Sequence, residues 1–173
     1  MSNPHRRLGR NMIWLMWLVL LGLLTLFFGK LLDRQYNPNQ DLMQRQPGEP
    51  REVVLLRNKY GHYVASGLIN DQPVVFLLDT GASDISIPAA AARRLALERG
   101  RPVRYQTANG IVTGYATRLD SVTLGAITLR NLPASINPNM QGDEVLLGMS
   151  FLKHVEFTQK GKTLTLRQEW FKP

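Results

Sequence analysis

The distribution of apolar residues divides the chain into three parts. From Met12 to Gly29 the sequence reads MIWLMWLVLLGLLTLFFG and contains no charge. Residues 33–51 are rich in Asn, Gln and Pro and have no apolar periodicity, which is typical of a flexible linker. After that segment, short apolar stretches alternate with turn residues. This pattern predicts a folded domain over residues 52–173.

The first apolar stretch has the length of a membrane span. As a helix it is about 27 Å long, close to the thickness of about 30 Å of a hydrocarbon core. Its uniformly apolar circumference argues against the alternative, a core helix of a soluble protein. Residues 25–30 contain no small-x-small cleavage site, which favours a retained anchor over a cleaved signal peptide. We therefore predict a transmembrane helix over residues 12–32.

The charges beside this helix predict its orientation. Arg6, Arg7 and Arg10 precede it within residues 1–11, whereas Lys30 and Arg34 follow it and are offset by an aspartate. Positive charge favours the cytoplasmic side of a membrane. We expect a single-pass protein of the inner (cell) membrane with its N-terminus in the cytoplasm and its folded domain in the periplasm.

The pattern within residues 52–173 is mainly that of strands. Asn109-Gly110 is a strong hairpin signal, and Gly125-Ala126 joins a second pair of short strands. A helix is expected over residues 88–97, with proline in its first turn, and a short one after residues 145–148. Strands are expected over residues 52–57, 62–70, 74–78, 103–107, 111–119, 122–124, 127–129 and 163–167. This pattern predicts a mainly β fold, a compact closed barrel with one or two short helices.

Composition removes several classes of function. The chain has no cysteine, and its three histidines show no ligand spacing, so we expect no disulfide, metal site or cofactor. The net charge is +8, but the domain's arginines are not interleaved with aromatic residues. We interpret them as a solvated face and expect no nucleic-acid partner. The loosely clustered arginines are Arg93, Arg94, Arg99, Arg101 and Arg104.

One short segment carries candidate chemistry. The apolar run 74–78 leads directly into Asp79-Thr80-Gly81, which is followed by Ala82. This string resembles the active-site motif of aspartic peptidases. The chain is similar to the retropepsin-like (clan AA) aspartic proteases, and more narrowly to their bacterial membrane-anchored members. Further along, Leu146-Leu147-Gly148 and the short helical stretch after it resemble the second glycine element of that family.

The resemblance implies a closed barrel of the acid-protease type and a role for each motif residue. Two carboxylates would activate a water for hydrolysis of a peptide bond, sharing one proton between them. Asp79 would be the catalytic carboxylate, Thr80 would hydrogen-bond across the pair, and Gly81 would let the backbone approach it closely. Substrate contacts would come from Ala82 and from a flap hairpin, namely Ala108, Asn109 and Gly110.

The number of Asp-Thr-Gly motifs predicts how many chains form the active site. The chain contains a single Asp-Thr-Gly, and a domain of this size is half of a two-lobed enzyme. The second carboxylate would therefore come from a second copy in a symmetric homodimer. The expected function is that of a membrane-anchored aspartic endopeptidase acting on a peptide or protein substrate.

Several interpretations stay open from the residues alone. Retroviral members commonly brace the dimer with an ion pair at the positions that Ser83 and Met149 occupy here. Asp84 either hydrogen-bonds a substrate backbone or simply lies in the loop. Asn109-Gly110 is either a flap or an ordinary surface hairpin. Asp79 is either catalytic or a structural turn residue, and in the second case the chain is a membrane-tethered binding or scaffolding module.

Overall fold

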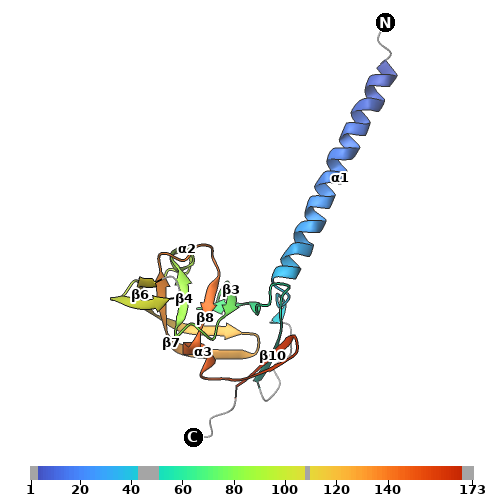
Figure 1. Ribbon diagram of the computed structural model, residues 1–173. Coiled ribbons are helices and arrows are strands. Elements are labelled where there is room, and N and C mark those ends of the chain that lie inside the picture. The colour runs from blue at the N-terminus through green and yellow to red at the C-terminus, as the bar shows by residue number, and fades with distance from the viewer. Residues whose placement is uncertain (1–3, 43–50, 108–109, 169–173) are drawn as a thin grey trace. The chain divides into compact units, whose positions relative to one another are not determined.

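The computed structural model describes residues 4–42, 51–107 and 110–168. The chain divides into two parts, Met1–Gln35 and Tyr36–Pro173. Helix α1 (Pro4–Tyr36) makes up the described residues of the first part, and the second part contains the strands and the two short helices (Figure 1).

Helix α1 has no apolar packing along the stretch predicted to span a membrane. The side chains of residues 11–28 are all exposed. Over Asn11–Tyr36 the helix is long and apolar enough to cross a membrane, which makes it a candidate for a membrane span or a signal sequence. The helix also extends beyond the predicted bounds of 12–32 at both ends.

The second part is built around a closed six-stranded barrel, as the pattern of short strands predicts. The barrel closes because β2 pairs with β6, joining Leu68 to Thr123 and Ile69 to Val122. Each inward side chain therefore meets side chains from the opposite wall, and Phe76 and Ile136 are completely buried. Around the barrel, the strands are β2 (Val64–Ile69), β3 (Gln72–Leu78), β8 (Val145–Leu147), β4 (Ile85–Pro88), β7 (Ile127–Asn137) and β6 (Gly110–Leu124).

Strand β5 (Pro102–Thr107) lies outside the closed ring. It pairs with β6 alone and forms with it a hairpin that extends from the barrel (Figure 1). Thr107 pairs with Gly110. The two strands expected on either side of Asn109-Gly110 are present, and β6 begins at Gly110.

A second, smaller sheet contains both ends of the folded part. Its antiparallel strands are β1 (Arg51–Leu56), β10 (Thr163–Gln168) and β9 (Glu156–Lys160), in that order. Val53, Leu55 and Leu166 of this sheet belong to the same buried core as the barrel interior. The two sheets are therefore held together by one hydrophobic core.

The two short helices are α2 (Ala89–Arg94) and α3 (Met149–Leu152). The helix expected over residues 88–97 ends at Arg94 because Ala96 adopts a left-handed conformation with φ of 52°. Pro88 ends strand β4, which apolar periodicity does not predict because it is only four residues long. β9 is likewise unpredicted because all five of its residues are exposed.

Residues 33–42 are more ordered than the linker composition of 33–51 indicates. Helix α1 continues to Tyr36, and Asn39 is buried against the ends of β1 and β2. The Asn39 Nδ2 atom donates to the Leu56 oxygen (2.9 Å) and the Val64 oxygen (2.7 Å), and its Oδ1 accepts from the Leu56 amide (2.7 Å). An asparagine amide thus completes the hydrogen bonding of two strand ends, as a further peptide group would.

Candidate active site

Asp79 lies directly after β3, the strand that carries the longest apolar run of the domain. β3 pairs antiparallel with β2 and parallel with β8, so it is fixed on both sides. The Asp79 amide continues the parallel ladder by donating to the Leu147 oxygen (3.2 Å). The carboxylate therefore leaves a doubly paired strand at its carboxyl end, where it is half-buried.

The turn after Asp79 folds back onto its carboxylate. The Gly81 amide donates to Asp79 Oδ1 (2.8 Å), and the Ala82 amide donates to the Asp79 carbonyl oxygen (3.3 Å). A Cβ atom on Gly81 would lie 3.1 Å from Asp79 Oδ1, which is tighter than an ordinary contact. Thr80 and Gly81 are exposed. This geometry orients the carboxylate and leaves the residues beside it accessible.

The Leu146-Leu147-Gly148 segment crosses next to the same loop, in keeping with the resemblance. The Met149 amide donates to the Ala82 oxygen (2.8 Å), and the Ser150 amide donates to the Ser83 oxygen (3.0 Å). A Cβ atom on Gly148 would lie 2.3 Å from the Asp84 oxygen and 2.5 Å from the Ala82 oxygen. Only glycine allows two backbones to pass this closely, so Gly148 fixes the position of the loop.

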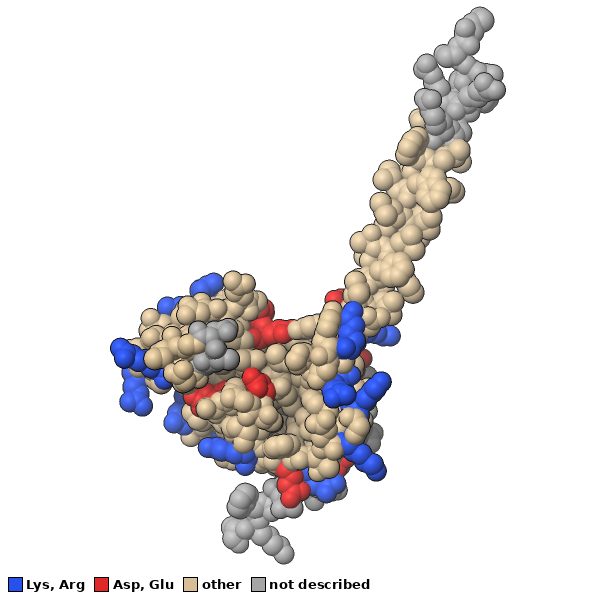
Figure 2. All heavy atoms as spheres, in the orientation of Figure 1, with Lys and Arg blue, Asp and Glu red and all other residues tan. Residues whose placement is uncertain are grey.

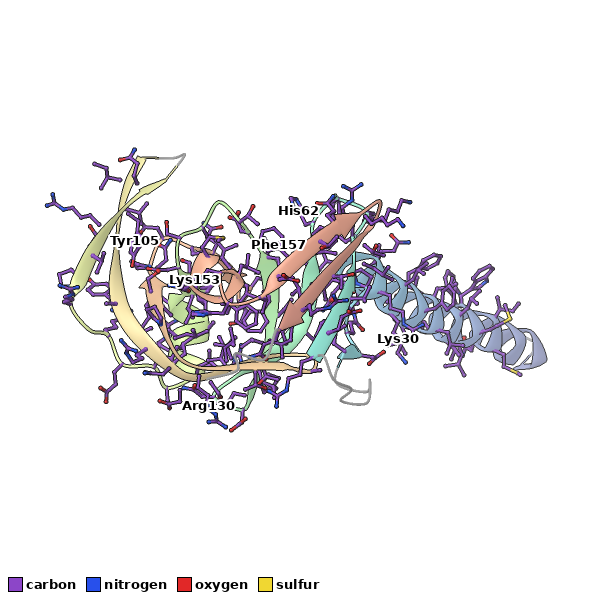
Figure 3. The ribbon with its side chains drawn as sticks, turned by 90° about the horizontal axis from the view of Figure 1, so that it is seen from below. Lys30, His62, Tyr105, Arg130, Lys153 and Phe157 are labelled. Carbon is purple, nitrogen blue, oxygen red and sulfur yellow. The ribbon has the colours of Figure 1, made fainter. Side chains whose placement is uncertain are left out.

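Tyr105 connects the β5–β6 hairpin to the aspartate loop (Figure 3). Its hydroxyl donates to Asp84 Oδ2 (3.2 Å). Burial raises the pKa of Tyr105 above its ordinary value of 10.0, a hydrogen bond with Ser135 acts in the opposite direction, and the Asp84 charge adds to the increase. Tyr105 therefore stays protonated at neutral pH and remains a donor to Asp84.

A cavity of about 370 Å³ lies between the loop and the hairpin. Two carboxylates, Asp79 and Asp84, face it, together with hydroxyl and amide groups, and among the described residues no cationic side chain lines it. The lining residues are Asp79, Gly81, Ala82, Ser83, Asp84, Ser86, Tyr105, Gln106, Ser135, Asn137 and Leu146. The cavity therefore combines two carboxylates with hydroxyl, amide and apolar lining groups.

The structure brings together part of the predicted site. Asp79, Gly81 and Ala82 line the cavity, and Thr80 lies in the same turn. Gly110 opens β6 in a left-handed conformation with φ of 104°. Ala108 and Asn109, also predicted to contact substrate, lie outside the described residues.

Sequence reasoning missed the polar residues that reach the cavity from other strands. Ser135 and Asn137 come from β7, and Tyr105 and Gln106 from β5. Tyr105 belongs to a stretch of alternating apolar and polar residues just before a hairpin, and this alternation was the sequence signal that could have identified it. Nothing in the sequence pattern distinguishes Ser135 or Asn137, because their place depends on the parallel pairing of β4 with β7.

The clustered arginines lie on the surface, away from this cavity. All five are exposed, Arg94 forms an ion pair with Asp143 (2.8 Å), and Arg99 lies 5.2 Å from the centre of the Tyr115 ring. On the face of the folded part drawn in Figure 2, basic side chains are distributed around the margin.

Comparisons with known proteins agree with this fold and motif. Residues 65–154, more than half of the chain, match the family model described as gag-polyprotein putative aspartyl protease. The crystal structure of a retropepsin-like aspartic protease from Rickettsia conorii is 30% identical, with a TM-score of 0.58 over 68% of this chain and 90% of that one.

Two curated relatives are uncharacterized proteins. One, from Sinorhizobium sp, is 33% identical over 63% of this chain and 48% of its own length. The other, from Rickettsia prowazekii (strain Madrid E), is 29% identical over 68% of this chain and 52% of its own length. The chain thus spans about half the length of the curated relatives it matches.

In this fold a closed barrel places Asp-Thr-Gly at the end of a doubly paired strand, and a second glycine element crosses beside that motif. The fold is that of a retropepsin-like aspartic protease. The chain belongs to the gag-polyprotein putative aspartyl protease family.

Proposed function

We propose that the protein is a membrane-anchored aspartic endopeptidase in which Asp79 from each of two copies activates the hydrolytic water. One observation carries this proposal. The Asp79 carboxylate is held by the Gly81 amide at the edge of a cavity that a strand hairpin adjoins. That arrangement offers a fixed acid or base beside a space that a peptide segment can enter.

The chemistry requires two carboxylates of unequal protonation. One accepts a proton from the water, and the other, protonated, donates a hydrogen bond to the scissile carbonyl oxygen. Two like charges about 3 Å apart do not both ionise, so a pair of Asp79 side chains shares one proton. Thr80, exposed beside Asp79, is available to hydrogen-bond across the pair to the second copy.

The need for a second copy is supported by the surroundings of Asp79. Among the described residues, Asp84 is the only other carboxylate that lines the cavity, and it already accepts the Tyr105 hydroxyl. The sequence contains no second Asp-Thr-Gly. A homodimer supplies the missing carboxylate by symmetry.

The lining of the cavity supports a preference among peptide substrates. Asp84 and the hydroxyls of Ser86 and Ser135 face the space without a cationic side chain among the described lining residues. Asp84 places a negative charge beside this space, so a basic substrate side chain next to the scissile bond would meet an opposite charge there. The anchor would be α1, with the folded part in the periplasm.

The test uses the full-length protein in membranes or detergent with a mixed peptide library between about pH 4 and 7. Asp79→Asn removes the ionisable group while keeping the size of the side chain, and we expect hydrolysis to fall about a thousandfold or more. Asp71→Asn is the matched control. Asp71 is exposed in a turn with φ of 61°, a conformation that asparagine tolerates.

Three outcomes decide the proposal. Loss of hydrolysis in Asp79→Asn but not in Asp71→Asn supports it, provided that both variants keep the urea unfolding midpoint of the parent. Undiminished hydrolysis in Asp79→Asn overturns it. A correctly folded parent without hydrolysis over the whole library overturns it too, in favour of a tethered binding module.

A further inference from the structure

The turn between β1 and β2 is held in place by Asn58. This side chain is buried, and its Oδ1 atom accepts from the backbone amides of Tyr60 and His62, both at 2.9 Å. The Gly61 amide donates to the Asn58 backbone oxygen (3.1 Å), and Gly61 has a left-handed φ of 90°. The exposed side chains of this turn are therefore presented by a fixed backbone.

The connection between β9 and β10 lies beside this turn. The Arg57 amide donates to the Lys162 oxygen (2.8 Å), which joins the two segments. We call residues 57–62 and 160–162 together the basic tip, because they contain four basic residues and no acidic one. All four basic side chains are exposed, namely Arg57, Lys59, Lys160 and Lys162.

The basic tip also contains an exposed aromatic ring. Tyr60 is 61% exposed, and the Lys59 Nζ atom lies 5.0 Å from the centre of its ring. A tyrosine combines an apolar ring with a polar hydroxyl, so it is well suited to the interface between water and lipid. Lysine and arginine are attracted to the anionic phosphates of that interface. The residue types of the basic tip therefore match a layer of lipid headgroups.

Tyr36 links the basic tip to the candidate membrane span. It is the last residue of that span, Asn11–Tyr36, and also the first residue of the second part of the chain. Its ring centre lies 6.3 Å from that of Tyr60, and its backbone oxygen accepts from Asn58 Nδ2 (3.0 Å). Along the helix Tyr36 is about 6 Å beyond Leu32, and a headgroup layer is about 5 to 8 Å thick. If α1 crosses a membrane, Tyr36 lies at headgroup depth with Tyr60 beside it.

We propose that the basic tip binds the anionic phospholipid headgroups of the membrane that α1 crosses. Lys59 and Lys162 contact lipid phosphates, and the Tyr60 ring lies among the headgroups. Among the described residues, none of the basic tip lines the cavity beside Asp79, so bound lipid does not occupy that cavity. The proposal rests on the part of the proposed function that makes α1 a membrane anchor, and it does not depend on hydrolysis.

The absence of cysteine from the sequence allows a single fluorescent probe to be attached to the full-length protein. His62→Cys places the probe in the basic tip and keeps its four basic residues and Tyr60, whereas Arg130→Cys places it on β7. Both positions are exposed, and Figure 3 shows them on opposite sides of the folded part.

The labelled proteins are reconstituted into vesicles that contain a fixed amount of a quenching lipid with a nitroxide on a neutral headgroup. The vesicles are made of phosphatidylcholine, either alone or with roughly one-third phosphatidylglycerol, which is anionic. We expect phosphatidylglycerol to increase quenching of the His62→Cys probe about threefold and to change that of the Arg130→Cys probe little. Salt at about 0.5 M should remove the increase, because it screens the attraction between the basic tip and the phosphates.

Charge neutralisation provides the second arm, in the His62→Cys background. Lys59→Gln combined with Lys162→Gln removes two charges from the basic tip. Arg93→Gln combined with Arg101→Gln is the matched control, because it removes two exposed charges outside the basic tip and changes the net charge equally. Each basic side chain near an anionic surface changes the binding equilibrium about fivefold. The variant in the basic tip should therefore lose the increase with phosphatidylglycerol, and the control should keep it.

The outcomes separate lipid binding from the proposed function. An increase at His62→Cys alone, removed by salt and by the two changes in the basic tip, supports lipid binding. Equal quenching of that probe in the two kinds of vesicle overturns it, because the anchor alone then accounts for the probe's position. An increase that both double variants lose equally overturns it too, because net charge then suffices. Specific lipid binding with hydrolysis that does not depend on Asp79 leaves the lipid site standing and overturns the peptidase.

Discussion

The aspartate loop and the β5–β6 hairpin face the same cavity but are held in very different ways. The loop is fixed by backbone hydrogen bonds from Asp79 to Leu147, from Met149 to Ala82 and from Ser150 to Ser83. Strand β5 has one neighbouring strand, and it contacts the loop through Tyr105. The carboxylate is thus on a strongly constrained backbone, and its cover is on a weakly constrained one. That division suits the proposed peptidase site, which must keep a charge in place and still admit a peptide.

Gly148→Ala should have the largest effect on stability, because Gly148 lies against the strongly constrained aspartate loop. The new Cβ would lie within 2.5 Å of two backbone oxygens, which cannot move without displacing the aspartate loop. We expect the free energy of unfolding to fall by about 3 kcal/mol or more. Urea unfolding of the full-length protein, followed by far-ultraviolet circular dichroism, measures this change.

Gly114→Ala is the matched substitution on the hairpin side. Its Cβ would lie 3.1 Å from the Ile136 oxygen and 3.2 Å from the Tyr105 ring, contacts that small shifts can relieve. We expect a loss of about 1 kcal/mol or less. Equal losses for the two alanine variants would contradict the difference in constraint.

Ser150→Ala should have an intermediate effect on the constrained side. Ser150 is buried, and its Oγ accepts from the Ile85 amide (3.0 Å) just after the aspartate loop. Removing the hydroxyl leaves that amide unsatisfied, at a cost of about 1 to 3 kcal/mol. Ser150→Thr keeps the acceptor and serves as a control for the hydrogen bond. Unfolding in which alanine is no worse than threonine would show that the bond contributes little.

Tyr105→Phe should have the smallest effect on stability and should act mainly on substrate binding. It removes a neutral donor to the Asp84 carboxylate and keeps the ring, so we expect the free energy of unfolding to change by about 1 kcal/mol at most. The hairpin is then less firmly held over the cavity, and we expect KM for a cleaved peptide to rise about threefold with kcat nearly unchanged.

The pKa of Tyr105 determines how the stabilities of the parent and of Tyr105→Phe differ with pH. A raised pKa in the folded state means that its contribution to stability is present below pH 10.0 and is lost as pH rises through the higher folded value. The parent should therefore lose stability relative to Tyr105→Phe only above about pH 10. Parallel stability profiles for the two proteins up to higher pH would contradict the raised pKa that burial gives Tyr105.

Predictions from the sequence were most accurate where a structural feature depends on residues that are neighbours along the chain. The apolar run over 74–78 indicates a buried strand, and Asp-Thr-Gly directly after it indicates the loop that the structure contains. It predicted poorly where a residue's partner is distant. Asn39 has the composition of a linker, but its amide bonds the ends of β1 and β2. β9 has no apolar alternation and is a strand because β10 pairs with it.

The sequence by itself determined the fold class, the position of the candidate carboxylate and the presence of a long apolar N-terminal helix, because each depends on residues that are neighbours along the chain. Only the tertiary structure decided what surrounds Asp79. It brought Tyr105, Ser135 and Asp84 to one cavity through pairing between strands that are distant in sequence. Among the described residues it also left the outer edge of β9 without a neighbouring strand, because β10 pairs with only one edge of β9. Long-range backbone pairing has no local signature, and the cavity depends on it.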